Sequence, residues 1–205
     1  MPFEHAVELA APRASSEDRA TVFHTREGLV IALADGAGGT SNGAAAAQAV
    51  IDAVGAAVAR DEPVDSAALL EELDASPALR GGQTTAVIVS LTADGITGAS
   101  VGDSGAWLLG DQLVDLTHRQ HRKPLLGSGA LITPFEAPPL GDRTLLVASD
   151  GLLSCLPLAR IAQIAVPRDL IAASRSLVGE LKRTHRGLTD DVAIVLCRMA
   201  AEAMP

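Results

Sequence analysis

Residues 29–39 read Leu29-Val30-Ile31-Ala32-Leu33-Ala34-Asp35-Gly36-Ala37-Gly38-Gly39, and this stretch decides the fold. Its unbroken apolar run predicts a strand that is buried on both faces. Asp35 stands at the strand end, where a charge can leave the core. The glycines that follow let the backbone turn sharply and come close to whatever the carboxylate binds. A solvated turn would show the same pattern, so a single such motif does not establish a site.

Composition and charge argue against membrane-spanning, secreted and nucleic-acid-binding proteins. The 205 residues are enough for one domain, 1–205, with a substantial core. Mean hydropathy is +0.27, but the apolar runs are shorter than the roughly 18 residues that span a bilayer. Glu4 and Glu8 interrupt any secretory apolar segment, so we expect a cytoplasmic protein without a membrane partner. A net charge of -9 with 2% aromatic residues argues against nucleic acid, whereas surplus acids are compatible with cations.

The two cysteines do not indicate a zinc site or a disulfide framework. The separation of Cys155 and Cys197 matches neither a zinc knuckle nor a disulfide framework. A thiolate phosphatase would place an arginine a few residues after its cysteine. The segment from Cys155 to Arg160 is one residue too short for that loop, and no histidine precedes the cysteine. We therefore expect both cysteines to be small buried hydrophobic residues.

Hydrophobic periodicity predicts an α+β layered domain. Strands are expected at 3–9, 21–24, 29–34, 84–91, 96–101, 106–109, 113–116, 144–148 and 192–197, and helices at 41–60, 65–78, 156–164 and 168–184. The short connections between the first three strands predict an antiparallel meander. Thr40 or Ser41 is the expected N-cap of the first helix, and residues 117–142 are expected to be irregular.

The aspartate-glycine pattern recurs at other strand ends. Carboxylates stand beside a glycine or a second acid in Asp35-Gly36, Gly102-Asp103, Asp150-Gly151 and Asp190-Asp191, and the loop pair Glu17-Asp18 adds a fifth place. If these ends converge, the acids repel one another unless a cation lies among them. Mg²⁺ and Mn²⁺ favour such oxygen ligands. The alternative is a set of separate solvated turns.

The ordered motif series resembles the metal-dependent protein phosphatases of the PPM (type 2C) family, in a compact bacterial-like form. It consists of Arg13-x-x-x-Glu17-Asp18, Asp35-Gly36-x-Gly38-Gly39, Gly82-x-Thr84-Thr85-Ala86, Gly102-Asp103-Ser104, Ser149-Asp150-Gly151 and Asp190-Asp191-Val-Ala-Ile-Val, and the resemblance spans about residues 5–198. Each motif is weak alone, but six in order are specific. The resemblance implies a four-layer α-β-β-α sandwich, with two mainly antiparallel sheets flanked by helices and a metal site at one end.

The resemblance also implies roles for individual residues. Asp35 would bridge two Mn²⁺ or Mg²⁺ ions, and the Gly36 carbonyl would be a further ligand. Asp150 and Asp190 would hold the first ion. The remaining implied roles are a ligand of the second ion for Glu17, a contact to metal-bound water for Asp18, a ligand of a third, weaker ion for Asp103, and a grip on the substrate phosphate for Arg13.

These roles imply a protein serine/threonine phosphatase that hydrolyses phosphomonoesters with a metal-activated water at a binuclear centre. Its partner would be a phosphorylated Ser/Thr protein. The alternative is a catalytically weak PPM-fold domain that binds or senses a ligand. Some family members have a histidine at the position of Ala37, and the segment between Asp103 and Asp150 is short for the family, which keeps this alternative open. A different carboxylate-metal hydrolase would lack the ordered motif series.

One basic cluster stands out in this acidic chain. Residues 118–123 read His118-Arg119-Gln120-His121-Arg122-Lys123. Such a cluster can attract phosphorylated partners to a site ringed by acids. A charge run of this kind also occurs as a solvated loop, and the sequence leaves both interpretations open.

Overall fold

The chain forms two antiparallel sheets of five strands each. The computed structural model describes residues 3–12, 14–37, 42–166 and 169–200. The first sheet contains, in spatial order, β1 (Phe3–Ala10), β10 (Val192–Met199), β9 (Thr144–Ala148), β6 (Gly105–Leu109) and β7 (Val114–Asp115). The second sheet contains β2 (Arg19–His24), β3 (Gly28–Ala34), β4 (Ala86–Thr92), β5 (Ile96–Val101) and β8 (Thr133–Ala137).

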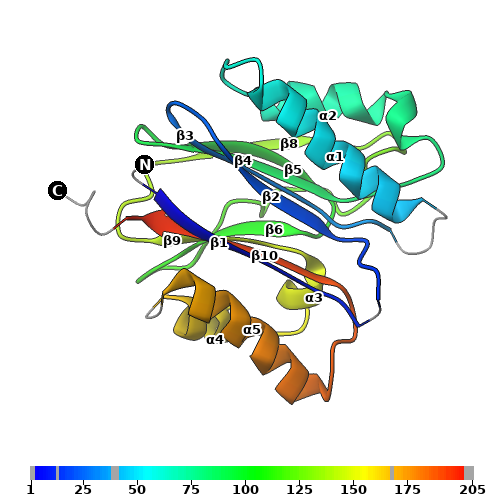
Figure 1. Ribbon diagram of the computed structural model, residues 1–205. Coiled ribbons are helices and arrows are strands. Elements are labelled where there is room, and N and C mark those ends of the chain that lie inside the picture. The colour runs from blue at the N-terminus through cyan, green and yellow to red at the C-terminus, as the bar shows by residue number, and fades with distance from the viewer. Residues whose placement is uncertain (1–2, 13, 38–41, 167–168, 201–205) are drawn as a thin grey trace.

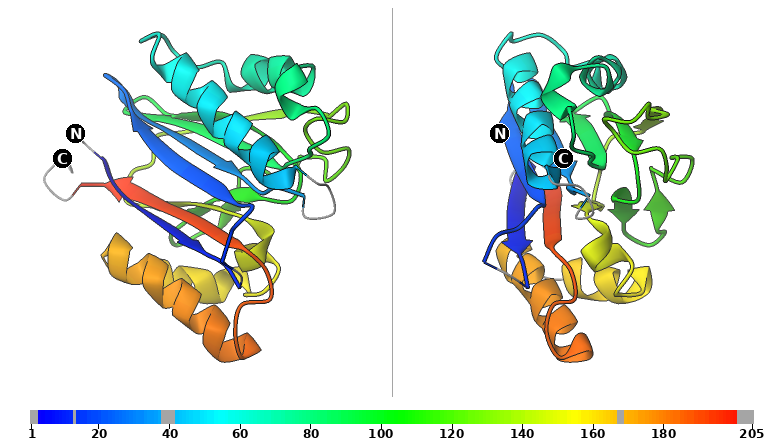
Figure 2. Two further views of the ribbon diagram at one scale, coloured as in Figure 1. Left: turned by 45° about the vertical axis from the view of Figure 1, so that its right-hand side comes forward. Right: turned by 90° about the vertical axis from the view of Figure 1, so that its right-hand side faces the viewer.

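Helices cover the outer face of each sheet, as Figures 1 and 2 show. The second sheet is covered by α1 (Gly43–Val58), α2 (Ser66–Asp74) and the 3-10 turn η1 (Pro77–Leu79). The first sheet is covered by α3 (Asp150–Leu153), α4 (Leu158–Ala165) and α5 (Leu170–His185). The expected four-layer α-β-β-α sandwich is therefore confirmed. No helix among the described residues is long and apolar enough to cross a membrane.

Strand β3 lies at the centre of the packing. All seven of its residues are buried. Leu29, Ile31 and Leu33 point into the core between the two sheets. On the other face, Val30, Ala32 and Ala34 pack against the helical layer of α1 and α2, where small side chains let helix and sheet approach closely. The prediction that this run is buried on both faces is confirmed.

The predicted meander of the first three strands is wrong. Strands β2 and β3 do pair, but β1 belongs to the other sheet, where it pairs with β10 from Phe3↔Met199 to Ala10↔Val192. The loop after Ala10 carries the chain from one sheet to the other. Short connections favour sequence neighbours as pairing partners, but β10 offers β1 a partner over its whole length.

Strand β8 appears where irregular structure was expected. Among the described strands it pairs only with β5, and its side chains alternate between half-buried and exposed. Pro134 lies within it, which an edge strand tolerates because one side of its backbone needs no partner. The helix α3, a single turn that starts at Asp150, was not expected either.

Other boundaries move by a few residues. The first helix begins at Gly43, and Asn42 at its N-cap makes no side-chain capping hydrogen bond. The expected caps Thr40 and Ser41 lie outside the described residues. The helix expected over 65–78 is divided, since α2 ends at Asp74 and Pro77 starts a separate 3-10 turn.

Candidate functional site

Asp35 is fixed through its backbone. It follows β3, and its N–H donates to the Thr85 hydroxyl at 3.0 Å. The Asp35 carbonyl accepts from the Thr84 hydroxyl at 2.9 Å and from the Thr85 N–H at 2.9 Å. The motif Gly82-x-Thr84-Thr85 therefore has a direct structural role, because its two threonines set the position of the Asp35 main chain.

The Gly102-Asp103-Ser104 motif is attached to the same threonine. The hydroxyls of Thr85 and Ser104 lie 2.7 Å apart and hydrogen-bond to each other. Gly102 has φ +101°, and a Cβ there would lie 2.6 Å from Thr85 Cγ2. Only glycine permits this approach without strain. Asp103 is thereby held at the end of β5, beside the strand pair that ends at Asp35.

In the first sheet, Asp150 and the Asp190-Asp191 pair are held together in the same way. The N–H of Ser149 donates to the Ala193 carbonyl at 3.1 Å, and the Ala193 N–H donates to the Ser149 hydroxyl at 2.9 Å. A Cβ on Gly151 would lie 1.9 Å from the carbonyl oxygen of Asp191. This glycine therefore allows the start of α3 to lie directly against the start of β10.

The Glu17-Asp18 loop joins this group from the start of the second sheet. The Glu17 N–H donates to Asp191 Oδ2 at 2.6 Å. Asp18 is fully buried, and neither of its carboxylate oxygens has a hydrogen-bond partner among the described residues. A buried carboxylate without donors is costly unless it is protonated or neutralised by a cation.

The acids follow or precede strands of both sheets, and Figure 1 shows that α3, which begins at Asp150, lies at one end of the sandwich. Burial, followed by repulsion from Asp18 and Asp150, raises the pKa of Asp35 to about 9. Burial also raises the pKa of Asp18 to about 6, although polar interactions with Ser149 and Asp35 oppose that shift. Burial and then the charge of Asp103 raise the pKa of Asp150. Such mutual shifts show that these carboxyls share one electrostatic environment.

The predicted acids thus converge. Asp18, Asp35 and Asp150 interact directly, and Asp103 and Asp190 both act on Asp150. Two further predicted ligands are half-buried Glu17 and buried Gly36. A Cβ on Gly36 would lie 2.4 Å from the backbone carbon of Gly43, so this glycine allows the chain after Asp35 to meet the start of α1. Arg13 lies outside the described residues.

Within the described residues, no group of three or more His, Cys, Asp or Glu side chains is arranged so that it could hold a metal ion as it stands. Asp18, Asp35 and Asp150 are nevertheless close enough to influence one another's pKa.

Sequence reasoning missed the supporting residues. Asp191, Ser149 and Thr85 bind backbone groups of the chain that carries the acids, and none of them was singled out for this role. The available signal was their place inside the motifs. Because their partners lie far away in the sequence, the motifs alone do not reveal what they bind.

The cysteines stand apart from the acids. Both are free; Cys197 is fully buried, as expected, and burial raises the pKa of its thiol to about 12. Cys155 is only half-buried, so the expectation of full burial is wrong for it, because it lies in the exposed turn between α3 and α4. Neither supports thiolate chemistry at this site.

No family model matches the chain, and no curated protein matches it. Solved structures of serine/threonine phosphatases share its fold. The catalytic domain of the serine/threonine protein phosphatase PstP, in complex with two manganese ions, has a TM-score of 0.76 and 22% identity, covering 97% of this chain and 98% of that one. The S. agalactiae serine/threonine phosphatase has a TM-score of 0.77 and 21% identity, covering 97% and 100%. Stp1 from Staphylococcus aureus has a TM-score of 0.78 and 18% identity, covering 97% and 95%. The fold is therefore that of these phosphatases.

Proposed function

We propose that this protein is a metal-dependent serine/threonine phosphatase, formed by a single domain over 1–205, that hydrolyses phosphomonoesters on protein substrates. One observation carries the proposal: the fully buried Asp18 carboxylate, which has no hydrogen-bond partner among the described residues, lies beside Asp35 and Asp150. The shared fold supports it, because one solved structure with this fold is a phosphatase catalytic domain in complex with two manganese ions.

The residues fit hard divalent ions in donor type and charge. Every candidate ligand is a carboxylate or carbonyl oxygen, which suits Mn²⁺ and Mg²⁺. Asp35 would bridge two ions with the Gly36 carbonyl as a further ligand. Asp150 and Asp190 would hold the first ion, Glu17 the second, and Asp103 a third, while Asp18 would act through water. Because burial and repulsion raise the pKa of Asp35, binding of an ion by this carboxylate would release a proton.

When bound, the ions supply a nucleophilic water at neutral pH and stabilise charge on the phosphoryl oxygens. The residues of the chain do the positioning. Thr84 and Thr85 hold the main chain of Asp35, and Asp191 holds the backbone of Glu17. Arg13 would bind the substrate phosphate through its guanidinium. Ala37 offers no proton to the leaving alkoxide, which predicts slow turnover for substrates with poor leaving groups.

The second candidate is a catalytically weak domain of the same fold that binds or senses a ligand. One observation favours it: the side chain of Ala37 cannot donate a proton to a leaving group. Such a domain would bind Mn²⁺ or phosphopeptide without turnover. For either function, the two free thiols agree with a reducing compartment, and we propose a cytoplasmic protein.

Hydrolysis of a phosphothreonine peptide with Mn²⁺, beside an EDTA control, tests the proposal. We expect phosphate release that requires Mn²⁺ and that is lost in Asp35→Asn, which removes the charge of the bridging acid. The matched control is Asp94→Asn, because Asp94 is an exposed acid in the turn between β4 and β5, at the end of the sheet opposite to Asp35. Tight Mn²⁺ binding without phosphate release would favour the binding domain. Release that persists in EDTA would exclude the metal mechanism.

A further inference from the structure

We propose that the pocket beside Asp103 binds the substrate chain next to its phosphoresidue, and that it selects an apolar side chain flanked by acidic residues. This inference rests on the proposed phosphatase function and names its substrate class. The pocket has a volume of about 380 Å³, and Asp103 and Arg122 both line it. That volume is within the range of side-chain and small-ligand sites.

The floor of the pocket is apolar. It is formed by Trp107 on β6, Leu153 on α3 and Leu158 at the start of α4, all half-buried, over the buried Leu156 and Ile161. Half-buried side chains of this kind keep apolar surface in water until a partner covers it. An aliphatic or aromatic side chain of a peptide supplies that cover.

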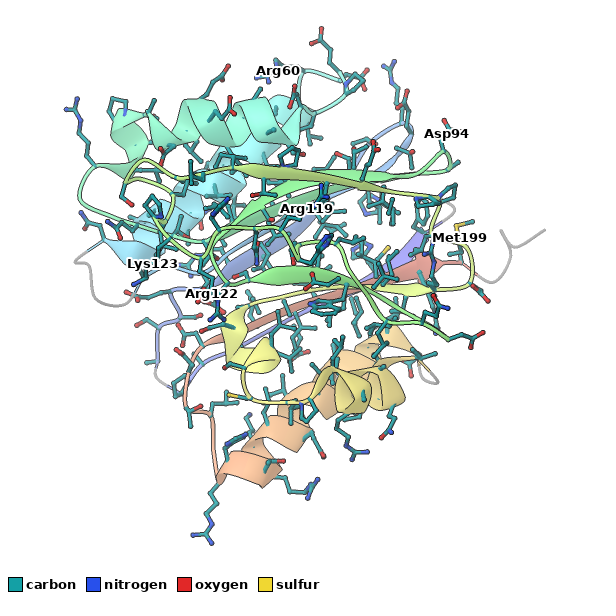
Figure 3. All side chains as sticks on the ribbon, turned by 180° about the vertical axis from the view of Figure 1, so that it is seen from behind. Arg60, Asp94, Arg119, Arg122, Lys123 and Met199 are labelled. Atoms are coloured by element: carbon teal, nitrogen blue, oxygen red, sulfur yellow. The ribbon has the colours of Figure 1, made fainter. Side chains whose placement is uncertain are left out.

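The rim of the pocket is basic. His118 and Arg122 line it, and Arg119 and Lys123 belong to the same exposed segment. Figure 3 shows Arg119, Arg122 and Lys123 on one side of the molecule. None of these three cations forms an ion pair with another described residue. In a chain of net charge -9, this is a local positive surface next to the acidic site.

Two acids also line the pocket, and both are already engaged. Asp115 Oδ1 accepts from the N–H and the hydroxyl of Thr117, each at 2.8 Å. Asp103 faces Asp150, whose pKa it helps to raise, and belongs to the proposed metal centre. The positive charge available to an incoming peptide in this pocket is therefore that of Arg122, with Lys123 next to it in the chain, and it is complementary to Glu and Asp.

The basic segment is anchored to the site. The Gly102 N–H donates to the His121 carbonyl at 2.9 Å, and the Gln120 side-chain amide donates to the Ser104 carbonyl at 2.7 Å. Both bonds end on the motif that carries Asp103. The cations are thus held at a fixed place relative to the acids, so a peptide that spans both surfaces has little ordering cost to overcome on the protein side.

Trp107 is the single tryptophan of the chain, so its emission reports on this pocket directly. The probes are two peptides that carry one leucine and no phosphate, one flanked by glutamates and one by lysines. We expect the glutamate peptide to change the Trp107 emission with saturation and to bind about tenfold more tightly, the effect of a few exposed charge pairs. Arg122→Glu should abolish that preference. Arg60→Glu makes the same charge change at an exposed residue away from the basic segment (Figure 3) and should retain it.

Activity assays distinguish a failure of the docking proposal from a failure of the proposed phosphatase function. With phosphothreonine versions of the two peptides, Arg122→Glu should raise KM for the glutamate peptide about tenfold relative to KM for the lysine peptide. Equal losses in Arg122→Glu and Arg60→Glu, no response of Trp107, or tighter binding of a short RNA than of the glutamate peptide would overturn the docking proposal. Absence of Mn²⁺-dependent p-nitrophenyl phosphate hydrolysis in the unaltered protein would instead refute the phosphatase function, and the Trp107 titration would still decide the docking.

Discussion

The backbone N–H of Glu17 donates a 2.6 Å hydrogen bond to the carboxylate of Asp191, 174 positions later in the chain. This bond joins the loop before the second sheet to the start of β10 in the first sheet. It fixes the distance between the acids of the Glu17-Asp18 pair and those that precede β10. Asp191 thus positions the proposed metal ligand Glu17 and does not itself bind an ion in this assignment.

Asp191→Ala should weaken Mn²⁺ binding about tenfold, because loss of a supporting contact to a metal ligand typically costs 10-fold to 100-fold in affinity. Asp191→Asn keeps an acceptor for the Glu17 N–H and should bind Mn²⁺ closer to the unaltered protein. Calorimetric titration with Mn²⁺ measures both. If the alanine variant binds as tightly as the asparagine variant, the hydrogen bond does not position Glu17.

The metal-free protein should lose stability as pH rises from about 4 to about 9. The pKa of Asp35 is about 9 in the fold and near 3.8 in the unfolded chain, so between these values the folded state binds the extra proton. The free energy of unfolding then falls with pH, by at most about 1.4 kcal/mol per unit for one such group. Asp18, with a pKa of about 6, adds to the fall between about 4 and 6.

Urea unfolding in EDTA across this pH range measures the effect. Asp35→Asn, which imitates the protonated acid, should flatten the dependence, and saturating Mn²⁺ should reverse it because the ions favour ionised ligands. A stability that rises with pH in EDTA would show that Asp35 is ionised in the metal-free fold.

Asp103→Ala and Asp150→Ala should fail in different ways. Asp150 interacts with Asp35 directly, whereas Asp103 acts on the cluster through its charge on Asp150. Loss of Asp150 should therefore weaken tight Mn²⁺ binding. Loss of Asp103 should leave that binding intact and slow single-turnover hydrolysis by about 10-fold to 1000-fold, the effect of one electrostatic or proton-transfer group. The measurements are the Mn²⁺ stoichiometry and the single-turnover rate of each variant. The assignment is wrong if Asp103→Ala loses tight Mn²⁺ binding while Asp150→Ala retains it.

Gly151→Ala should destabilise the fold by about 1–3 kcal/mol, the usual cost of overpacking. The added Cβ would lie 1.9 Å from the Asp191 carbonyl oxygen, a backbone atom that cannot turn aside. The control is Gly179→Ala in α5, where a Cβ meets nothing within 4 Å. That change should stabilise by about 0.4–1 kcal/mol, since alanine favours the helix and restricts the unfolded chain. Urea unfolding compares the pair, and equal effects would refute the close-packing argument.

Asp35, Asp103 and Asp150 were predictable because each stands beside a glycine next to a strand end. A buried strand that ends in an aspartate beside a glycine marks its own end, as Asp35-Gly36 does, and the series of such ends implied one site. The two-sided burial of β3 followed from the same run. The fold class was predictable for the same reason, since periodicity distinguishes the strands from the helices.

What could not be predicted depends on contacts that are distant in sequence. The partner of β1 is β10, at the other end of the described chain, so short connections suggested the wrong pairing. Asp191 accepts a hydrogen bond from the Glu17 N–H, and the Thr85 hydroxyl accepts one from the Asp35 N–H. No local sequence pattern indicates either bond. Strand β8 has no continuous buried face of its own, and only the free edge of β5 defines it.

The pairing of β1 with β10 has a consequence for synthesis on the ribosome. Residues 19–137 contain every strand of the second sheet, so this half can assemble while translation continues. Strand β1 is made before β10 and cannot pair until β10 is made, so until then its edge is open to other chains. Glu17 likewise meets Asp191 only after the ribosome has passed residue 191. The nascent polypeptide therefore lacks the complete acidic centre until β10 emerges, and no shorter translation product possesses it.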